Sequence, residues 1–125
     1  MQVISTGNAP QAIGPYVQGM CCGNLVFTSG QIALMPNGEM VGSDIKSQTN
    51  QVLKNLQEVL QEGGSDLNKV IKTTIFLADM EDFAVVNEIY AQYFQEHKPA
   101  RSTVAVKTLP KNALIEIECI ATRED

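Results

Sequence analysis

Two glutamates near the C-terminus, Glu116 and Glu118, stand among apolar residues in the segment Leu114–Thr122. The two-residue period of a β-strand puts both carboxyl groups on one face of that segment. A buried carboxyl group has either a raised pKa or a cationic partner, and both states suit proton transfer near neutral pH. The alternative is that this face of the strand is exposed to solvent. The pattern makes the two glutamates candidate acid–base residues.

Arg101 begins another predicted strand, Arg101–Thr108, and shares one face of it with Thr103, Ala105 and Lys107. A guanidinium at the mouth of a strand can bind a carboxylate through two parallel hydrogen bonds. The alternative is an exposed residue in an ordinary ion pair. Arg101 is therefore a candidate anchor for an acidic ligand.

Three other residues have both a structural and a functional interpretation. Asn87 interrupts the apolar face of a predicted helix and, if buried, needs a hydrogen-bond partner, either structural or a ligand. Gly30, in the segment Thr28–Gln31, lets a ligand approach the backbone closely or makes a bulge. Tyr16, which follows a Gly-Pro pair, offers an aromatic wall and a hydroxyl group or packs in the core.

The chain has few of the cysteine and histidine residues that metal binding and covalent catalysis use. Cys21, Cys22 and Cys119 form an odd set, and adjacent cysteines on a strand point to opposite faces. We expect all three to be small core residues in a reducing cytoplasm. The one histidine, His97, is expected as a cation near a helix C-terminus. We therefore predict no metal site, and nothing in the sequence points to a Ser-His-Asp triad.

The elements that must position these residues follow from apolar periodicity and from helix start and stop signals. Strands are expected at Tyr16–Cys22, Asn24–Ser29, Val70–Ala78, Arg101–Thr108 and Leu114–Thr122. One helix is expected at Ser43–Glu62, with Ser43 or Asp44 as its cap and Gly63-Gly64 as its stop. A second is expected at Met80–His97, capped by Asp79 and ended by Pro99.

The expected order of elements is β-β-β-α-β-α-β-β, in which one strand of the β-rich start has no assigned range. This order indicates an α+β fold with one mixed sheet. Both helices are apolar on one side only, so we expect them to cover one face of the sheet. The last strand is apolar on both faces. A single layer of helices buries one face, so we infer that other subunits bury the second.

Length and charge narrow the class of protein. The chain has 125 residues, a length that fits one domain over residues 1–125, and a net charge of −5. Its basic residues are scattered, which argues against a nucleic-acid partner. It shows no apolar run long enough to span a membrane and no secretory signal, so the expected location is cytoplasmic.

The segments Ala12–Tyr16, Thr28–Gln31, Lys98–Ser102 and Ile115–Glu118 resemble the Rid (YjgF, RidA) family in order and spacing, and so does Asp82–Asn87. The resemblance runs over essentially the whole chain. It implies a chorismate-mutase-like fold and a homotrimer in which the sheets face inward as a barrel, with clefts between subunits. A chorismate mutase activity would be an analogy of fold alone.

For function, the resemblance implies hydrolysis of reactive enamines and imines such as 2-aminoacrylate and 2-aminocrotonate, giving 2-oxo acids and ammonia without a cofactor. This activity is that of a 2-iminobutanoate/2-iminopropanoate deaminase. Arg101 then holds the substrate carboxylate, Glu116 orients or activates water, and the backbone of Gly30 lines the cleft. Tyr16 and Asn87 match further pocket positions.

Two stretches depart from the family pattern. Thr103 stands where this branch usually has Cys, although the role there rests mainly on backbone groups. Ala105–Thr108 replaces the usual Glu-Val-Ala-Arg at the rim. Two other functions stay open: a non-catalytic trimer that binds small carboxylates, and the RNA cleavage ascribed to some members, which the charge of this chain disfavours.

Overall fold

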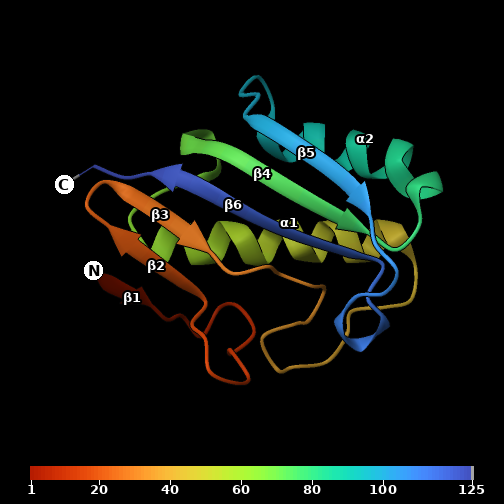
Figure 1. Cartoon of the computed structure of the whole chain (residues 1–125), viewed down its shortest axis with the longest axis horizontal. Coiled ribbons are helices and arrows are strands. Elements are labelled where there is room, and N and C mark those ends of the chain that lie inside the picture. Colours follow the sequence, from red (N-terminus) through yellow and green to blue (C-terminus); the bar gives the residue numbers. More distant parts are fainter. Residues whose placement is uncertain (125) are drawn as a thin grey trace.

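In a computed structural model, which describes residues 1–124, the chain folds into a six-stranded sheet with two α-helices on one face (Figure 1). The strands are β1 (Gln2–Ile4), β2 (Gly19–Cys22), β3 (Leu25–Thr28), β4 (Val70–Leu77), β5 (Ala100–Ala105) and β6 (Ile115–Thr122). The helices are α1 (Ile45–Glu62) and α2 (Phe83–Phe94). The expected α+β class, with one mixed sheet, is confirmed.

The last strand lies in the interior of the sheet, whose order is β1-β2-β3-β6-β4-β5. β6 is antiparallel to both neighbours, β3 and β4. The parallel pairing that a mixed sheet requires occurs between β4 and β5, which α2 connects. This topology puts Glu116 inside the sheet and Arg101 on the edge strand.

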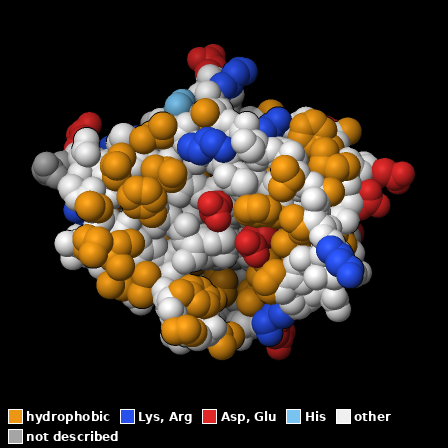
Figure 2. Space-filling view, viewed as in Figure 1, with side chains coloured by type: hydrophobic (Ala, Val, Ile, Leu, Met, Phe, Trp, Pro, Cys, Tyr) orange, Lys and Arg blue, Asp and Glu red, His pale blue; other side chains and the backbone are white. Residues whose placement is uncertain are grey.

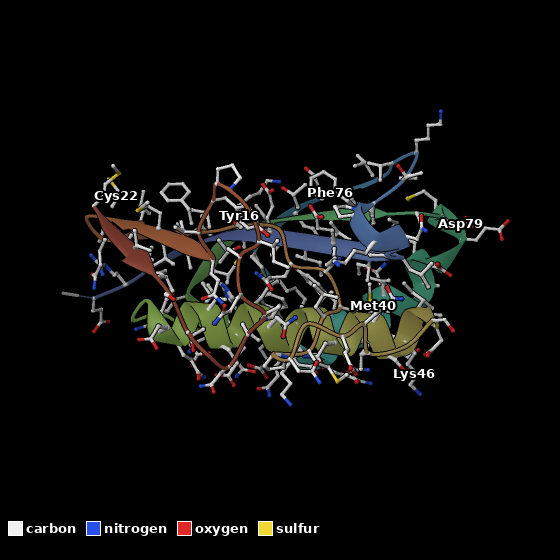
Figure 3. All side chains as sticks on the ribbon, turned by 90° about the horizontal axis from the view of Figure 1, so that it is seen from below. Tyr16, Cys22, Met40, Lys46, Phe76 and Asp79 are labelled. Carbon is white, nitrogen blue, oxygen red and sulfur yellow. The ribbon has the colours of Figure 1, made fainter. Side chains whose placement is uncertain are left out.

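Both helices cover the same face of the sheet, as the one-sided apolar stripes predicted (Figures 1 and 3). On α1 the stripe of Val52, Leu53, Leu56, Val59 and Leu60 is fully buried. It packs on the alternate residues of β6 that face the helices, from Ile115 to Ala121, each at most 3% exposed. Burial of apolar side chains at about 25 cal/mol per Å² is the main stabilising contribution to such a core.

Helix α1 begins and ends as expected. The Asp44 carboxylate accepts a hydrogen bond from Ser47 N at 2.8 Å, and Gly63 follows the last helical residue. Helix α2 is shorter than predicted. Asp79 caps a 3₁₀ turn, Met80–Asp82, that precedes the helix. The helix ends at Phe94, because φ of 59° at the following Gln95 leaves the helical region, so Pro99 is not its stop.

The strand ends also differ from the prediction in places. β2 begins at Gly19 rather than Tyr16 because Gln18 bonds to the N-terminal loop, accepting from Thr6 N at 2.7 Å and donating to Pro10 O at 2.8 Å. β5 ends at Ala105 rather than Thr108. No expected range covered the short strand β1, because its three residues are too few to show an alternation of apolar and polar side chains.

The sheet face away from the helices is largely apolar and uncovered. Phe27 is 40% exposed and Val104 is 45% exposed on this face. Figure 2 shows this face, with hydrophobic side chains around two acidic groups near its centre. We call this face, which also carries Met20, Phe76 and Ile120, the open sheet face.

None of the helices in residues 1–124 has the length and apolar character needed to cross a bilayer.

Candidate active site

Glu116 lies on the open sheet face in a row of paired residues. It pairs with Phe76 on β4, which in turn pairs with Val104 on β5. The carboxyl group is half-buried, and this burial raises its pKa above the ordinary value, with the nearby charge of Glu118 as the second cause. Both causes disfavour the ionised form of the carboxyl group, and no cation is among the causes of its pKa shift. Glu116 therefore has the environment of a carboxylate that accepts a proton more readily than an ordinary glutamate.

Gly30 lies directly against the Glu116 carboxyl group. A Cβ atom at position 30 would collide with that group, lying 2.8 Å from Cδ of Glu116. Reciprocal backbone hydrogen bonds between Gln31 and Ile117, at 2.9 and 3.1 Å, hold the two segments in this register. Only glycine lets the carboxyl group occupy this place.

Tyr16 lies on the same side of the molecule. Its hydroxyl oxygen accepts a hydrogen bond from Ile13 N at 3.4 Å, and its side chain is about half exposed. In Figure 3, Tyr16 and Phe76 lie on the side of the sheet away from the helices. Tyr16 and Gly30 line a groove of about 250 Å³ that Lys111 borders. Tyr16, Gly30 and Glu116 thus form one group, which we call the open-face group.

Arg101 lies on the other face of the sheet. It pairs with buried Thr73 on β4, so its side chain is on the helix side of the edge strand. The guanidinium carbon lies 4.9 Å from the centre of the Tyr90 ring and 5.5 Å from that of Phe83. Cation–π contacts of this length are attractive.

Asn87 and Arg101 line a second groove, of about 510 Å³, between α2 and β5. This volume falls in the usual range for small-molecule sites. Lys98 also lines it, and among the described residues of its wall none is acidic. In a chain of net charge −5, this groove is a local concentration of positive charge.

Thr103 lies two residues after Arg101 on the same face of β5. It pairs with Ile75, and its hydroxyl oxygen is buried with no hydrogen-bond partner among the described residues. A buried hydroxyl without a partner is uncommon. We call Arg101, Asn87 and Thr103 the edge group.

The chain therefore divides the predicted site residues between two faces of one sheet. The open-face group has a proton acceptor and a glycine cradle. The edge group has the cation and the amide. Because a sheet separates the Arg101 and Glu116 side chains, a single chain does not bring them to one ligand.

The residues that carry metal chemistry are dispersed. Within residues 1–124, no three His, Cys, Asp or Glu side chains lie close enough to hold a metal ion. His97 Nε2 lies 2.7 Å from Val70 O. Cys21 and Cys119 are buried, as expected, whereas Cys22 is exposed, which corrects the expectation that all three are core residues. Burial raises the pKa of the Cys119 thiol to about 12.

Two aromatic residues near Arg101 are not among the predicted site residues. Phe83 and Tyr90 are seven residues apart on α2, a spacing that puts them on one helix face with Asn87 between them. The same spacing is typical of a core stripe. Only the pairing of β5 with β4 shows that Arg101 lies over both rings.

The fold and this divided site define a small α+β protein, and comparison with known proteins gives the family. Residues 6–123 match the family described as Endoribonuclease L-PSP, so the chain belongs to it, and the expected Rid (YjgF, RidA) membership is confirmed. The chain is 55% identical to Reactive Intermediate Deaminase A, chloroplastic, of Arabidopsis thaliana, over 97% of this chain and 65% of that protein.

It is 46% identical to the 2-iminobutanoate/2-iminopropanoate deaminase of Escherichia coli K12, over 98% of each chain. The crystal structure of E. coli TdcF with bound serine superposes with a TM-score of 0.94 and 44% identity, covering 99% of this chain and 100% of that one.

Proposed function

We propose that this protein is a hydrolase that deaminates small 2-imino acids to 2-oxo acids and ammonia. In this proposal the site is shared between copies of the chain. The edge group of one copy meets the open-face group of the next in a homotrimer whose open sheet faces point inward. The names of the relatives support the reaction. The serine in TdcF supports the ligand class, because an amino acid carries its carboxylate and nitrogen on adjacent carbons, as a 2-imino acid does.

The division of the site carries the proposal. Arg101 and Glu116 lie on opposite faces of one sheet, so they meet at a single ligand only between chains. The open sheet face is apolar and exposed at Phe27 and Val104, which favours its burial against other copies. A ring of copies with a repeated head-to-tail contact would put one site at each interface.

Arg101 performs the first task, binding of the substrate carboxylate. Its guanidinium forms two parallel hydrogen bonds to the carboxylate, which fixes the imine carbon in one position. Positioning a substrate and a water molecule in this way can lower the barrier by about 7 kcal/mol or more in ideal cases. Asn87 lines the same groove as this cation and offers amide hydrogen bonds to the same ligand.

Glu116 performs the second task, proton transfer. The imine carbon is electrophilic, so water adds to it directly, its oxygen forming the new C–O bond while Glu116 accepts a proton. As the C=N π bond opens, this proton passes from Glu116 to the nitrogen and gives a carbinolamine. Glu116 then moves the hydroxyl proton to the nitrogen in the same way, so that the C–N bond breaks, ammonia leaves and the 2-oxo group forms. The raised pKa of Glu116 makes it a better base than an ordinary glutamate.

The test uses 2-aminoacrylate made in place by a pyridoxal-phosphate dehydratase, with 2-oxo acid release as the signal. Arg101→Ala lowers kcat/KM by about 100-fold, because it removes a charge-assisted bidentate contact. Glu116→Ala lowers kcat by about 100-fold or more, because it removes the base. Wild-type rates for both variants would contradict the proposal.

Mixing the two inactive variants tests the shared site. When equal amounts of Arg101→Ala and Glu116→Ala chains are refolded together, about three quarters of the trimers contain both. Each of these has one complete site out of three, so activity returns to about one quarter of the wild-type value. No recovery above the separate variants would contradict a site built from two copies.

The other two functions make different predictions. A non-catalytic binder would bind 2-oxobutanoate without turning over any imine. RNA cleavage, the activity in the family's description, would persist after rigorous purification at physiological salt. The net charge of −5 disfavours RNA binding, so we expect no cleavage and no nucleic-acid partner.

A further inference from the structure

The Arg101 guanidinium lies over two aromatic rings that come from one face of α2. The distances from its central carbon are 4.9 Å to the Tyr90 ring and 5.5 Å to the Phe83 ring. Arg101 itself is an exposed residue on an edge strand. Without the two rings, this side chain would have the rotamer freedom of any surface arginine.

The platform that carries the guanidinium is itself held in place. The Tyr90 hydroxyl group lies 2.7 Å from the hydroxyl group of Thr73, which is fully buried. The Tyr90 ring also stacks on Phe94, with ring centres 4.4 Å apart. Tyr90 is only 7% exposed, so its ring has little freedom to move.

A guanidinium uses its flat face for aromatic contacts and its edge for hydrogen bonds. A cation held over rings by its face therefore keeps its N–H edge free for a carboxylate. Holding it in this way also removes part of the entropy that carboxylate binding would otherwise lose. We propose that Phe83 and Tyr90 are positioning residues that hold the Arg101 guanidinium in its carboxylate-binding orientation, an inference that rests on the proposed function.

The test compares variants that remove a ring with variants that keep it. Phe83→Leu and Tyr90→Leu each raise KM for 2-aminoacrylate by about two- to fivefold, the equivalent of one cation–π contact, with kcat close to the wild-type value. Phe83→Tyr keeps a ring and restores KM relative to Phe83→Leu. Arg101→Lys keeps the positive charge but is not expected to reach the wild-type KM, since an ammonium has no flat face to stack on the rings.

Ile89→Ala is the matched control. Ile89 is a buried residue of α2, 4% exposed, that does not line the groove of Arg101. This variant loosens the helix but leaves KM unchanged. An equal rise of KM in Ile89→Ala and Phe83→Leu would overturn the proposal, because the effect would then be general loosening of α2. Unchanged KM in both leucine variants would also overturn it.

A second readout does not depend on turnover. Aromatic rings shift the NMR signals of protons above their faces upfield. The Arg101 side-chain signals are therefore expected upfield in the wild type. They are assigned by their loss in Arg101→Ala. These signals are expected to move toward ordinary values in Phe83→Leu. This variant alone is enough for the NMR test if Tyr90→Leu does not fold. Signals at ordinary values in the wild type would overturn the platform. Absence of imine hydrolysis by a wild type with shifted signals would refute the proposed function and leave the platform standing.

Discussion

At the scale of single residues, Glu116 combines a functional advantage with a cost in stability. Burial, followed by the charge of Glu118, raises its pKa in the folded chain. A group with a raised folded-state pKa binds its proton more tightly when folded. Its contribution to stability is therefore complete below the unfolded pKa and is lost as pH rises through the folded pKa. The ionised form of this base is held in an unfavourable place, as is common at active sites.

The pH dependence of activity tests this environment. Glu118→Gln removes the second cause of the raised pKa, so the acid limb of the kcat/KM profile is expected to move to lower pH. The measurement is kcat/KM for 2-aminoacrylate across pH in wild type and variant. Glu62→Gln is the control, because Glu62 is an exposed residue at the end of α1 that is not a cause of the Glu116 shift. An acid limb that stays in place in Glu118→Gln would refute the assignment of that limb to Glu116.

At the scale of elements, helix α1 holds the segment that follows Gly30. Asn55 is fully buried in the middle of the helix. Its side-chain amide donates to Ile32 O at 3.2 Å and to Leu34 O at 2.8 Å. These bonds attach the loop to the helix, and the loop carries the glycine that cradles the Glu116 carboxyl group.

Substitution of this asparagine tests the attachment. Asn55→Leu leaves two carbonyl groups without their donor and is expected to cost about 1–3 kcal/mol of unfolding free energy, measured by urea denaturation. The kcat value is expected to fall as well, because the Gly30 segment loosens beside Glu116. Asn50→Ala is the matched control, since the amide of Asn50 bonds only to Lys46 O within its own helix. Equal losses in the two variants would show that Asn55 has no special role in the loop.

At the scale of the whole molecule, the open sheet face is the feature that one chain leaves unsatisfied. Its apolar residues surround two carboxyl groups (Figure 2). An apolar face of this kind on a small α+β protein favours association. The proposed trimer would bury it and complete three sites at once.

A charge on this face is expected to separate the copies. Phe27→Lys puts a cation on a strand that the proposed interface buries, so light scattering should report a monomer with native circular dichroism and no deaminase activity. Val85→Lys is the control, because Val85 is exposed to a similar degree, 39% against 40%, but lies on α2 in the other layer. An active trimer of Phe27→Lys would contradict the proposed burial of this face, and a monomeric wild type would contradict the shared site.

Local periodicity was enough to predict every helix and strand except β1, the single layer of helices and the residues that share a face within the predicted strands. Glu116 and Glu118 were placed together on β6 in this way, and Arg101 with Thr103 on β5. Such patterns depend only on neighbours within a few positions in the chain, so they can be read from the residues alone. The family resemblance added the roles, which periodicity does not contain.

Other features depend on which strand pairs with which, and in what register. That Arg101 and Glu116 lie on opposite faces of the sheet follows from the parallel pairing of β5 with β4 and the antiparallel pairing of β6 with β4. The contact of Gly30 with Glu116 and the rings beneath Arg101 are likewise contacts between distant segments. Packing between such segments has no local signature, because it is set by the burial of the whole core.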